Sequence, residues 1–122
     1  MITRFAGASI WSEDLNKLLP FYRDVLGLKV SMESPGYVIL GGDATNAATL
    51  ALATHSEVHG RNQDPARHMV AFATDDCQAD WKRLKAAGVE FVQEPTSEDG
   101  LVIATLKDPE GNLVQLFQYS QT

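Results

Sequence analysis

Apolar residues recur with two different periods along this chain. Residues 3–11 are mostly apolar and predict a strand, and in residues 15–26 the apolar positions recur every three or four residues, as in an amphipathic helix. Gly27 follows as a helix stop. Three further strands are predicted after the helix, at residues 28–33, 37–41 and 48–54. Turn-forming residues separate these strands, at 34–36 and 42–46.

The start of the first helix is marked by polar residues that favour helix N-termini. Ser12, Glu13 and Asp14 offer an N-cap and acids for the first turn. Pro20 disagrees with this pattern, because proline lacks the backbone N–H that a helix interior uses. We therefore expect either a kink at Pro20 or a helix that starts later than the apolar period suggests.

The same order of elements appears again in the second half of the chain. Residues 67–74 predict a strand, Asp75 or Asp76 caps a second helix, and Gly88 ends it. Three strands then follow, at residues 89–93, 101–106 and 113–118. Turn-rich segments separate them, at residues 94–100 and 108–112. The sequence thus predicts an α+β protein built as a tandem βαβββ repeat.

Length and composition predict one domain over residues 1–122. Chains of 122 residues usually form a single compact domain, and 44% hydrophobic with 21% charged residues is ordinary for a globular protein. The first module covers residues 1–54 and the second residues 67–122. Residues 55–66 are polar and contain Gly60 and Pro65, so we expect them to link the two modules.

Charge and cysteine usage exclude several classes of partner. A formal charge of −6 repels phosphate backbones and anionic lipid headgroups, so neither a nucleic acid nor a membrane is expected as a partner. No apolar run reaches the 18 residues that a membrane-spanning helix needs. Cys77 is the only cysteine, which rules out an intrachain disulfide and favours a cytoplasmic location.

Two groups of reactive side chains deserve a chemical interpretation. His55 and His59 have a four-residue spacing that brings imidazoles together on a helix, but glycine and proline around them favour a loop, so solvated linker residues are preferred over a metal site. Cys77 lies near a helix N-terminus, yet the neighbouring Asp75, Asp76 and Asp80 oppose a thiolate. We expect a structural thiol.

Two motifs carry a resemblance to a known superfamily. The segment Phe21-Tyr22-Arg23-Asp24-Val25-Leu26-Gly27-Leu28 and the turn Asp108-Pro109-Glu110-Gly111-Asn112 resemble signatures of the vicinal oxygen chelate superfamily. That superfamily includes glyoxalase I, extradiol dioxygenases, fosfomycin-resistance transferases and bleomycin-resistance proteins. The resemblance covers almost the whole chain. It implies that the two βαβββ modules form a cup-shaped mixed sheet with the helices on its outer face.

The resemblance also implies where metal ligands would stand, and this chain departs from the pattern there. The family's ligand positions fall on Gly7, near Ala51, on Met69 and on Gln115, none of which offers an imidazole or carboxylate. Catalytic zinc, nickel or iron sites need about three such donors. His68 is a weak metal candidate, because a one-residue bulge would turn it toward the cup in place of Met69. The expectation is therefore a protein without a metal cofactor.

Strand alternation predicts an apolar cup for a small molecule. Side chains two residues apart share a face, so the predicted ligand-binding residues are Phe5, Ser9, Trp11, Met69, Ala71, Leu113, Gln115 and Phe117, beside Gly7 and Ala73. Such a lining suits an apolar or aromatic ligand, with Ser9 and Gln115 as polar anchors. By resemblance to bleomycin-resistance proteins, which sequester a drug in clefts of a dimer, we expect a homodimer and no catalytic residue.

Two alternatives stay open on sequence grounds. One is an enzyme of the same superfamily, a glyoxalase-like lyase or isomerase or a dioxygenase, that either uses an atypical ligand set for Zn, Ni or Fe or needs no metal. The other is a structural or regulatory dimer whose cup is filled by its own side chains. Saturable ligand binding separates the first expectation from the filled cup, and activity gained on adding metal favours the metal-dependent enzyme.

Overall fold

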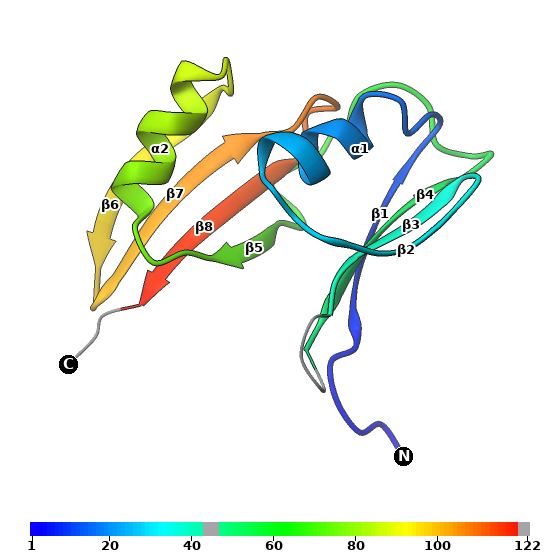
Figure 1. Cartoon of the computed structure of the whole chain (residues 1–122), viewed down its shortest axis with the longest axis horizontal. Helices are drawn as coiled ribbons and strands as arrows, with labels where there is room; N and C mark the ends of the chain where they lie inside the picture. Colours follow the sequence, from blue (N-terminus) through cyan, green and yellow to red (C-terminus); the bar gives the residue numbers. More distant parts are fainter. Residues whose placement is uncertain (43–46, 120–122) are drawn as a thin grey trace. The chain divides into compact units, whose positions relative to one another are not determined.

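A computed structural model describes residues 1–42 and 47–119, and the chain divides into two compact units, Met1–Gly60 and Arg61–Thr122. Each unit has the order strand, helix, strand, strand, strand (Figure 1). The predicted tandem βαβββ repeat is therefore confirmed. The boundary at Gly60 falls inside the segment predicted to link the modules, and most of the predicted loop at 42–46 lies outside the described residues.

The first unit is a four-stranded mixed sheet in the order β1-β4-β3-β2. Its elements are β1 (Gly7–Ser12), α1 (Leu18–Pro20), the π-helix η1 (Phe21–Val25), β2 (Val30–Ser34), β3 (Tyr37–Gly41) and β4 (Thr49–Thr54). Strand β1 runs parallel to β4, while β3 is antiparallel to both β4 and β2. One face of this sheet carries the buried core side chains Val38, Leu40, Leu50 and Leu52. Leu18, Phe21 and Tyr22 of the helical segment are buried as well.

The first helix starts later than its apolar period suggests. Helical structure begins at Leu18, so Pro20 stands in the first turn, where backbone N–H groups have no partner within the helix. This is the shifted start that Pro20 predicted. The expected cap residues bond ahead of the helix: the Ser12 hydroxyl binds the backbone of Asp14, and the Asp14 carboxylate accepts from the Asn16 N–H at 2.8 Å, while Lys17, directly before the helix, makes no side-chain cap bond. The side chains of Ser12 and Asp14 therefore hydrogen-bond within the turn that precedes the helix.

The second unit repeats the topology with sheet order β5-β8-β7-β6. Its elements are β5 (Val70–Ala73), α2 (Cys77–Ala86), β6 (Phe91–Glu98), β7 (Leu101–Lys107) and β8 (Leu113–Tyr119). Strand β5 is parallel to β8, and the other pairs are antiparallel. Helix α2 packs against β6, β7 and β8, as Figure 1 shows, and it buries Cys77 and Leu84 in that contact.

The predicted signals at helix α2 are confirmed. The Asp76 carboxylate accepts a hydrogen bond from the backbone N–H of Ala79 at 3.0 Å, which makes Asp76 the N-cap. The side-chain carbonyl of Gln118 accepts a second bond, from the N–H of Cys77 at 2.8 Å. Gly88 follows the helix with φ +93°, a left-handed conformation that a Cβ disfavours.

One predicted turn is a strand. Residues 94–98, assigned to a turn-rich segment, belong to β6, and the turn itself is the pair Asp99 and Gly100. Both have positive φ, as a two-residue hairpin requires. Pro95 misled the prediction, because proline weakens a strand, but here the pairing register shifts between Gln93 and Thr96. Proline is tolerated at such a shift, since its missing N–H is not needed in the ladder.

Two predicted strands are also shorter than expected. Strand β1 begins at Gly7 rather than residue 3, and β5 covers Val70–Ala73 rather than 67–74. In both places the chain leaves its parallel neighbour: the pairing of β1 with β4 starts at Gly7 with Thr49, and that of β5 with β8 starts at Val70 with Val114. Before Gly7, the Ala6 carbonyl still accepts from the N–H of Thr49 at 3.2 Å, and strand structure begins one residue later.

The turn before β8 is held by a buried carboxylate. Asp108 is 4% exposed and accepts hydrogen bonds from the backbone N–H groups of Glu110 and Asn112 and from the side-chain amide of Asn112, at 2.8 to 3.0 Å. Arg61 and Asn62 bind the same turn from outside, through the carbonyl of Pro109 and the amide of Asn112. The motif thus acts as a structural turn, as the sequence predicts.

Candidate functional site

Each sheet has a second face, turned away from the buried leucine and valine core, and we call it the open face. In the first unit the strand register brings together on it Ser9, Trp11, Met32, Tyr37, Ile39, Ala51 and Ala53. Ser9 lies beside Ala51, and Trp11 beside Ala53, across the parallel pair β1 and β4. Alanines therefore form the floor of this face, while larger side chains stand around them.

Trp11 is the most prominent side chain of this face. It is 46% exposed, and its ring meets the imidazole of His55 edge to face, with ring centroids 5.5 Å apart. Met32, at the other edge of the sheet, is also 46% exposed. An indole that keeps one side open offers a stacking surface for a flat molecule.

Gly7, to which the sequence resemblance assigns the first metal-ligand position, lies on the same strand as Ser9 and Trp11, and the backbone there is tightly packed. A Cβ atom built on Gly7 would lie 2.2 Å from the backbone oxygen of Thr49 and 2.9 Å from its hydroxyl. Real side chains never approach that closely, so β1 and β4 would have to separate to admit any other residue. The glycine is thus required by strand packing, and a histidine at this position does not fit the observed backbone.

The open face of the second unit has a polar row across three strands. Ala71 lies beside Gln115, Gln115 beside Thr105, and Thr105 beside Gln93. The Gln115 amide donates to the Thr105 hydroxyl, which in turn donates to the side-chain carbonyl of Gln93, each at 3.4 Å. These are long, neutral hydrogen bonds, and they leave further donor and acceptor capacity on both amides.

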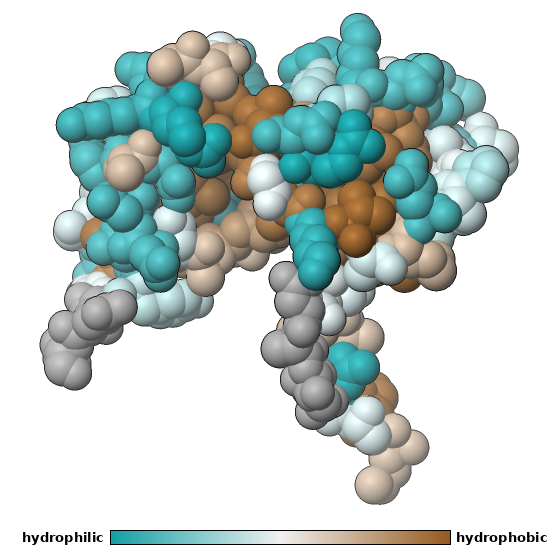
Figure 2. Space-filling model, viewed as in Figure 1, coloured by the Kyte–Doolittle hydropathy of each residue, from teal (hydrophilic) through white to brown (hydrophobic). Residues whose placement is uncertain are grey.

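Apolar side chains flank this row on the same face. Ala73, Phe117 and Ile103 are neighbours across β5, β8 and β7. The ring of Phe117 meets that of Tyr119 edge to face at 6.3 Å, and Tyr119 is 63% exposed. Figure 2 shows hydrophobic surface on both units with hydrophilic residues beside it. The open face thus combines aromatic rings with a short row of amides.

Three of the eight residues predicted to bind a ligand, Phe5, Met69 and Leu113, lie outside the open faces or at their edge. Phe5 precedes β1 and is 74% exposed, so strand alternation does not apply to it. Met69 and His68 precede β5 in the same way, and both are exposed. Leu113, at the start of β8, pairs with Lys107 at the edge of the open face. The other five lie on an open face through the register of their strands: Ser9, Trp11, Ala71, Gln115 and Phe117.

Sequence reasoning missed several residues of these faces. They are Met32, Tyr37 and Ile39 in the first unit, and Gln93, Ile103, Thr105 and Tyr119 in the second. Alternation within residues 37–41 and 101–106 was available as a signal. Which of the two alternating sets shares a face with Trp11 or Gln115 depends on cross-strand register, which one sequence does not provide.

The donor chemistry does not fit a divalent metal. Within residues 1–42 and 47–119, no group of three or more His, Cys, Asp or Glu side chains is placed to hold an ion. The open faces offer amides, hydroxyls, a thioether and aromatic rings, whereas zinc, nickel and iron sites use imidazole, carboxylate or thiolate donors. No step through a metal is therefore derived from this site.

The two linker histidines serve local structure. The Nδ1 atom of His55 accepts a hydrogen bond from the backbone N–H of Glu57 at 3.0 Å. His59 lies 3.5 Å from the Glu13 carboxylate, whose other oxygen accepts from the N–H of Gly60. The contact of His59 with Glu13 and the bond from Gly60 to the same carboxylate tie the segment after β4 back to the end of β1.

Cys77 has the properties of a structural thiol. It is fully buried at the start of α2, and burial first, then the charges of Asp80 and Asp76, raise the pKa of its thiol. A raised pKa lowers the fraction of reactive thiolate at neutral pH.

None of the helices among the described residues is long and apolar enough to cross a membrane.

Tandem βαβββ units with mixed sheets define a two-module fold, and comparisons with known proteins give it a family. Residues 4–116 match the Glyoxalase/Bleomycin resistance protein/Dioxygenase superfamily, and the chain belongs to it. The chain is 32% identical over 117 residues to a probable lactoylglutathione lyase of Vibrio cholerae, covering 88% of this chain and 85% of that protein. It is 29% identical to the lactoylglutathione lyase of Haemophilus influenzae, covering 89% and 87%.

Solved structures show the same fold. TnmS3, an antibiotic binding protein from Streptomyces sp. CB03234, superimposes with a TM-score of 0.76 at 23% identity, over 98% of this chain and 99% of that chain. A superfamily member from Sphaerobacter thermophilus gives a TM-score of 0.75 at 22% identity, over 96% and 98%. The resemblance drawn from the two sequence motifs is confirmed at the level of superfamily and fold.

Proposed function

We propose that this protein binds a small apolar or aromatic molecule on the open faces of its sheets and does so without a metal ion. The observation that carries the proposal is the chemistry of the family's metal positions: Gly7 has no room for a side chain, Ala51 has no donor, and Gln115 is a neutral amide. A superfamily member described as an antibiotic binding protein supports the idea that the fold serves binding alone.

The open faces supply two kinds of interaction for such a ligand. Trp11 and Phe117 offer aromatic surfaces for stacking, which contributes through buried area and ring geometry. The row of Gln93, Thr105 and Gln115 offers hydrogen bonds to a carbonyl, hydroxyl or amide of the ligand. Ligand sites commonly combine a mostly apolar wall with a few polar groups that fix orientation.

The proposal includes a homodimer in the cytoplasm. A two-fold dimer presents each open face twice and creates two equivalent clefts, each shaped by both chains. Mass measurement of the native protein, by light scattering or native mass spectrometry, is expected to give twice the chain mass of 13.3 kDa. A single chain mass at micromolar concentration would contradict this part of the proposal.

Quenching of Trp11 fluorescence tests ligand binding directly. Trp11 is on an open face, whereas Trp81 lies on α2. The variant Trp81→Phe therefore keeps only the fluorescent tryptophan at the site, and Trp11→Phe keeps only the one away from it. We expect 2-naphthol, phenanthrol or anthraquinone to quench Trp81→Phe saturably, with a Kd of about 1 to 100 μM. The matched variant Trp11→Phe is expected to show no saturable change.

The opposite pattern, saturable quenching of Trp81 alone, would place the ligand elsewhere and contradict the proposal. Absence of saturable quenching with all three compounds would favour the alternative in which the protein's own side chains fill the site.

A second candidate function is a metal-dependent lyase, favoured by one observation. Relatives named lactoylglutathione lyase are 29–32% identical over almost the whole chain. This candidate requires an ion held by an atypical ligand set. Turnover of lactoylglutathione, measured with and without added Zn²⁺, Ni²⁺ or Fe²⁺, separates the lyase from the binding protein. Metal-dependent turnover supports the lyase. Absence of turnover under all conditions supports a protein that only binds its ligand.

A further inference from the structure

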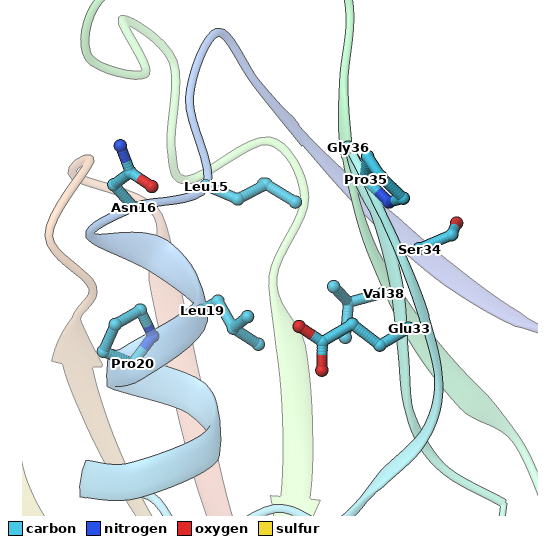
Figure 3. A pocket seen from close by; sticks show the side chains of 9 residues that line it. All are labelled: Leu15, Asn16, Leu19, Pro20, Glu33, Ser34, Pro35, Gly36 and Val38. Atoms are coloured by element: carbon cyan, nitrogen blue, oxygen red, sulfur yellow. The ribbon is translucent and has the colours of Figure 1, made fainter.

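The first unit has a groove outside the open faces. It lies between the start of the helical segment and the hairpin of β2 and β3, and it encloses about 460 Å³. Figure 3 shows its lining, which comprises Leu15, Asn16, Leu19, Pro20, Glu33, Ser34, Pro35, Gly36 and Val38. This volume is within the range of small-molecule sites, about 300 to 1,000 Å³.

The walls of the groove are largely apolar and come from two rigid elements. Leu15 and Leu19 are four residues apart on one side of the helical segment, linked by the bond from the Leu19 N–H to the Leu15 carbonyl at 3.0 Å. Val38 faces them from the centre of the sheet and is 2% exposed. Leu15 and Leu19 are half-buried and offer hydrophobic surface that a ligand body can cover, with the buried Val38 behind it.

One charged group reaches into this apolar setting. In Figure 3 the Glu33 carboxylate extends from β2 toward Leu19. Its side chain is exposed, so the carboxylate stands at the rim of the groove. The positive charge of Arg23 interacts with Glu33, but the Arg23 guanidinium donates two hydrogen bonds to the Asp24 carboxylate, at 2.8 and 2.9 Å. The bonds and charge of Asp24 raise the pKa of Arg23 most, and Glu33 contributes least.

The groove and Trp11 are on opposite faces of the same sheet. Glu33 pairs with Val38, and Val38 with Leu52, while Trp11 pairs with Ala53. Neighbouring residues of β4 point to opposite faces, so a molecule in the groove does not touch Trp11. Binding at the groove is therefore independent of the proposed function.

We infer that this groove binds a compact organic cation, whose amidinium or ammonium group pairs with Glu33 and whose apolar body packs on Leu15, Leu19 and Val38. The ligand class follows from charge complementarity. An exposed carboxylate at the edge of an apolar groove favours a cation with a hydrophobic body, because such a ligand matches both the charge and the apolar wall. An anion or a neutral polar molecule satisfies neither.

Benzamidine and benzamide form a matched pair of probes, since they share shape and differ in charge. In a ¹H–¹⁵N NMR titration of the full chain, benzamidine is expected to bind with a Kd of about 1 mM, and benzamide at least about tenfold more weakly. The shifted amides are expected in residues 15–20 and 33–38. Higher salt should weaken benzamidine binding and leave benzamide unchanged, because the pair with Glu33 is partly exposed.

Substitutions at two glutamates complete the test. Glu33→Gln keeps the side-chain shape without the charge and is expected to reduce benzamidine affinity about fivefold or more. Glu94→Gln removes an exposed carboxylate of the other unit and should leave affinity unchanged. Equal binding of both probes, unchanged affinity in Glu33→Gln, shifts confined to other residues, or no binding up to about 10 mM would each overturn the inference.

Discussion

Asp108→Ala is expected to lower the free energy of unfolding by about 3 kcal/mol, because it removes the acceptor of three buried hydrogen bonds at once. The backbone N–H groups of Glu110 and Asn112 and the amide of Asn112 then lose their partner inside the turn. For a chain of this size, thermal denaturation should show a melting temperature lower by about 12 °C. The turn sets the direction of β8, which carries both Gln115 and Phe117. Ligand binding should therefore weaken together with the stability of the fold.

Two further substitutions make this prediction specific. Asp108→Asn keeps one acceptor oxygen and is expected to fall between the parent protein and the alanine variant. Glu94→Ala removes an exposed carboxylate and should change the melting temperature by less than about 2 °C. Similar melting temperatures for Asp108→Ala and the parent would show that the turn does not depend on its carboxylate.

Gly7→Ala is expected to cost about 2 to 3 kcal/mol, the second largest effect that the structure predicts. The added methyl group would lie 2.2 Å from the Thr49 carbonyl oxygen, so the parallel pair β1 and β4 has to move apart. Denaturant unfolding measures the loss, and faster hydrogen exchange in β1 and β4 locates it. Ser9→Ala is the control, since Ser9 is exposed on the same face of the same strand.

The same geometry bears on whether a metal site can be restored. Gly7→His places an imidazole donor at the family's first ligand position, but its Cβ meets the same oxygen. We expect this variant to be less stable than the parent and still unable to hold an ion. A stable Gly7→His variant that binds zinc stoichiometrically would show that the two strands separate easily.

The element order was predictable from the sequence because local signals agree with it. Gly27 and Gly88 end the two helical segments with φ +81° and +93°, and Asp76 caps α2 as its position suggests. The misses have identifiable causes. Pro95 indicates a turn locally, whereas the shifted register of β6 and β7 accommodates it within a strand. Ser12 indicates an N-cap, but its hydroxyl is used by the turn before the helix.

The candidate site was less predictable, since it depends on which strands lie side by side. Alternation gives Ser9 and Trp11 one face, but only the pairing of β1 with β4, and of β4 with β3, adds Tyr37 and Ile39 to it. The row from Gln115 to Gln93 crosses three strands and has no signature in any one of them. The tightness around Gly7 is a backbone distance, which residue types alone do not encode.

These observations support a consistent interpretation of the family relationship. The fold is that of the Glyoxalase/Bleomycin resistance protein/Dioxygenase superfamily, while the positions to which the sequence resemblance assigns metal ligands hold a glycine, an alanine and an amide. Replacing ionisable donors with neutral groups changes what the open faces recognise. Under the proposed function, neutral, flat molecules bind through stacking and hydrogen bonds, with no ion to polarise them.

Metal content after reloading tests this interpretation most directly. The untagged protein is stripped with a chelator, dialysed separately against Zn²⁺, Ni²⁺ and Fe²⁺, passed through a desalting column and measured by elemental analysis. We expect below about 0.1 ion per chain for every metal, because the described residues bring no group of three or more His, Cys, Asp or Glu side chains together to hold an ion. One tightly held ion per chain, or one per two chains, would contradict the proposed metal-free binding function.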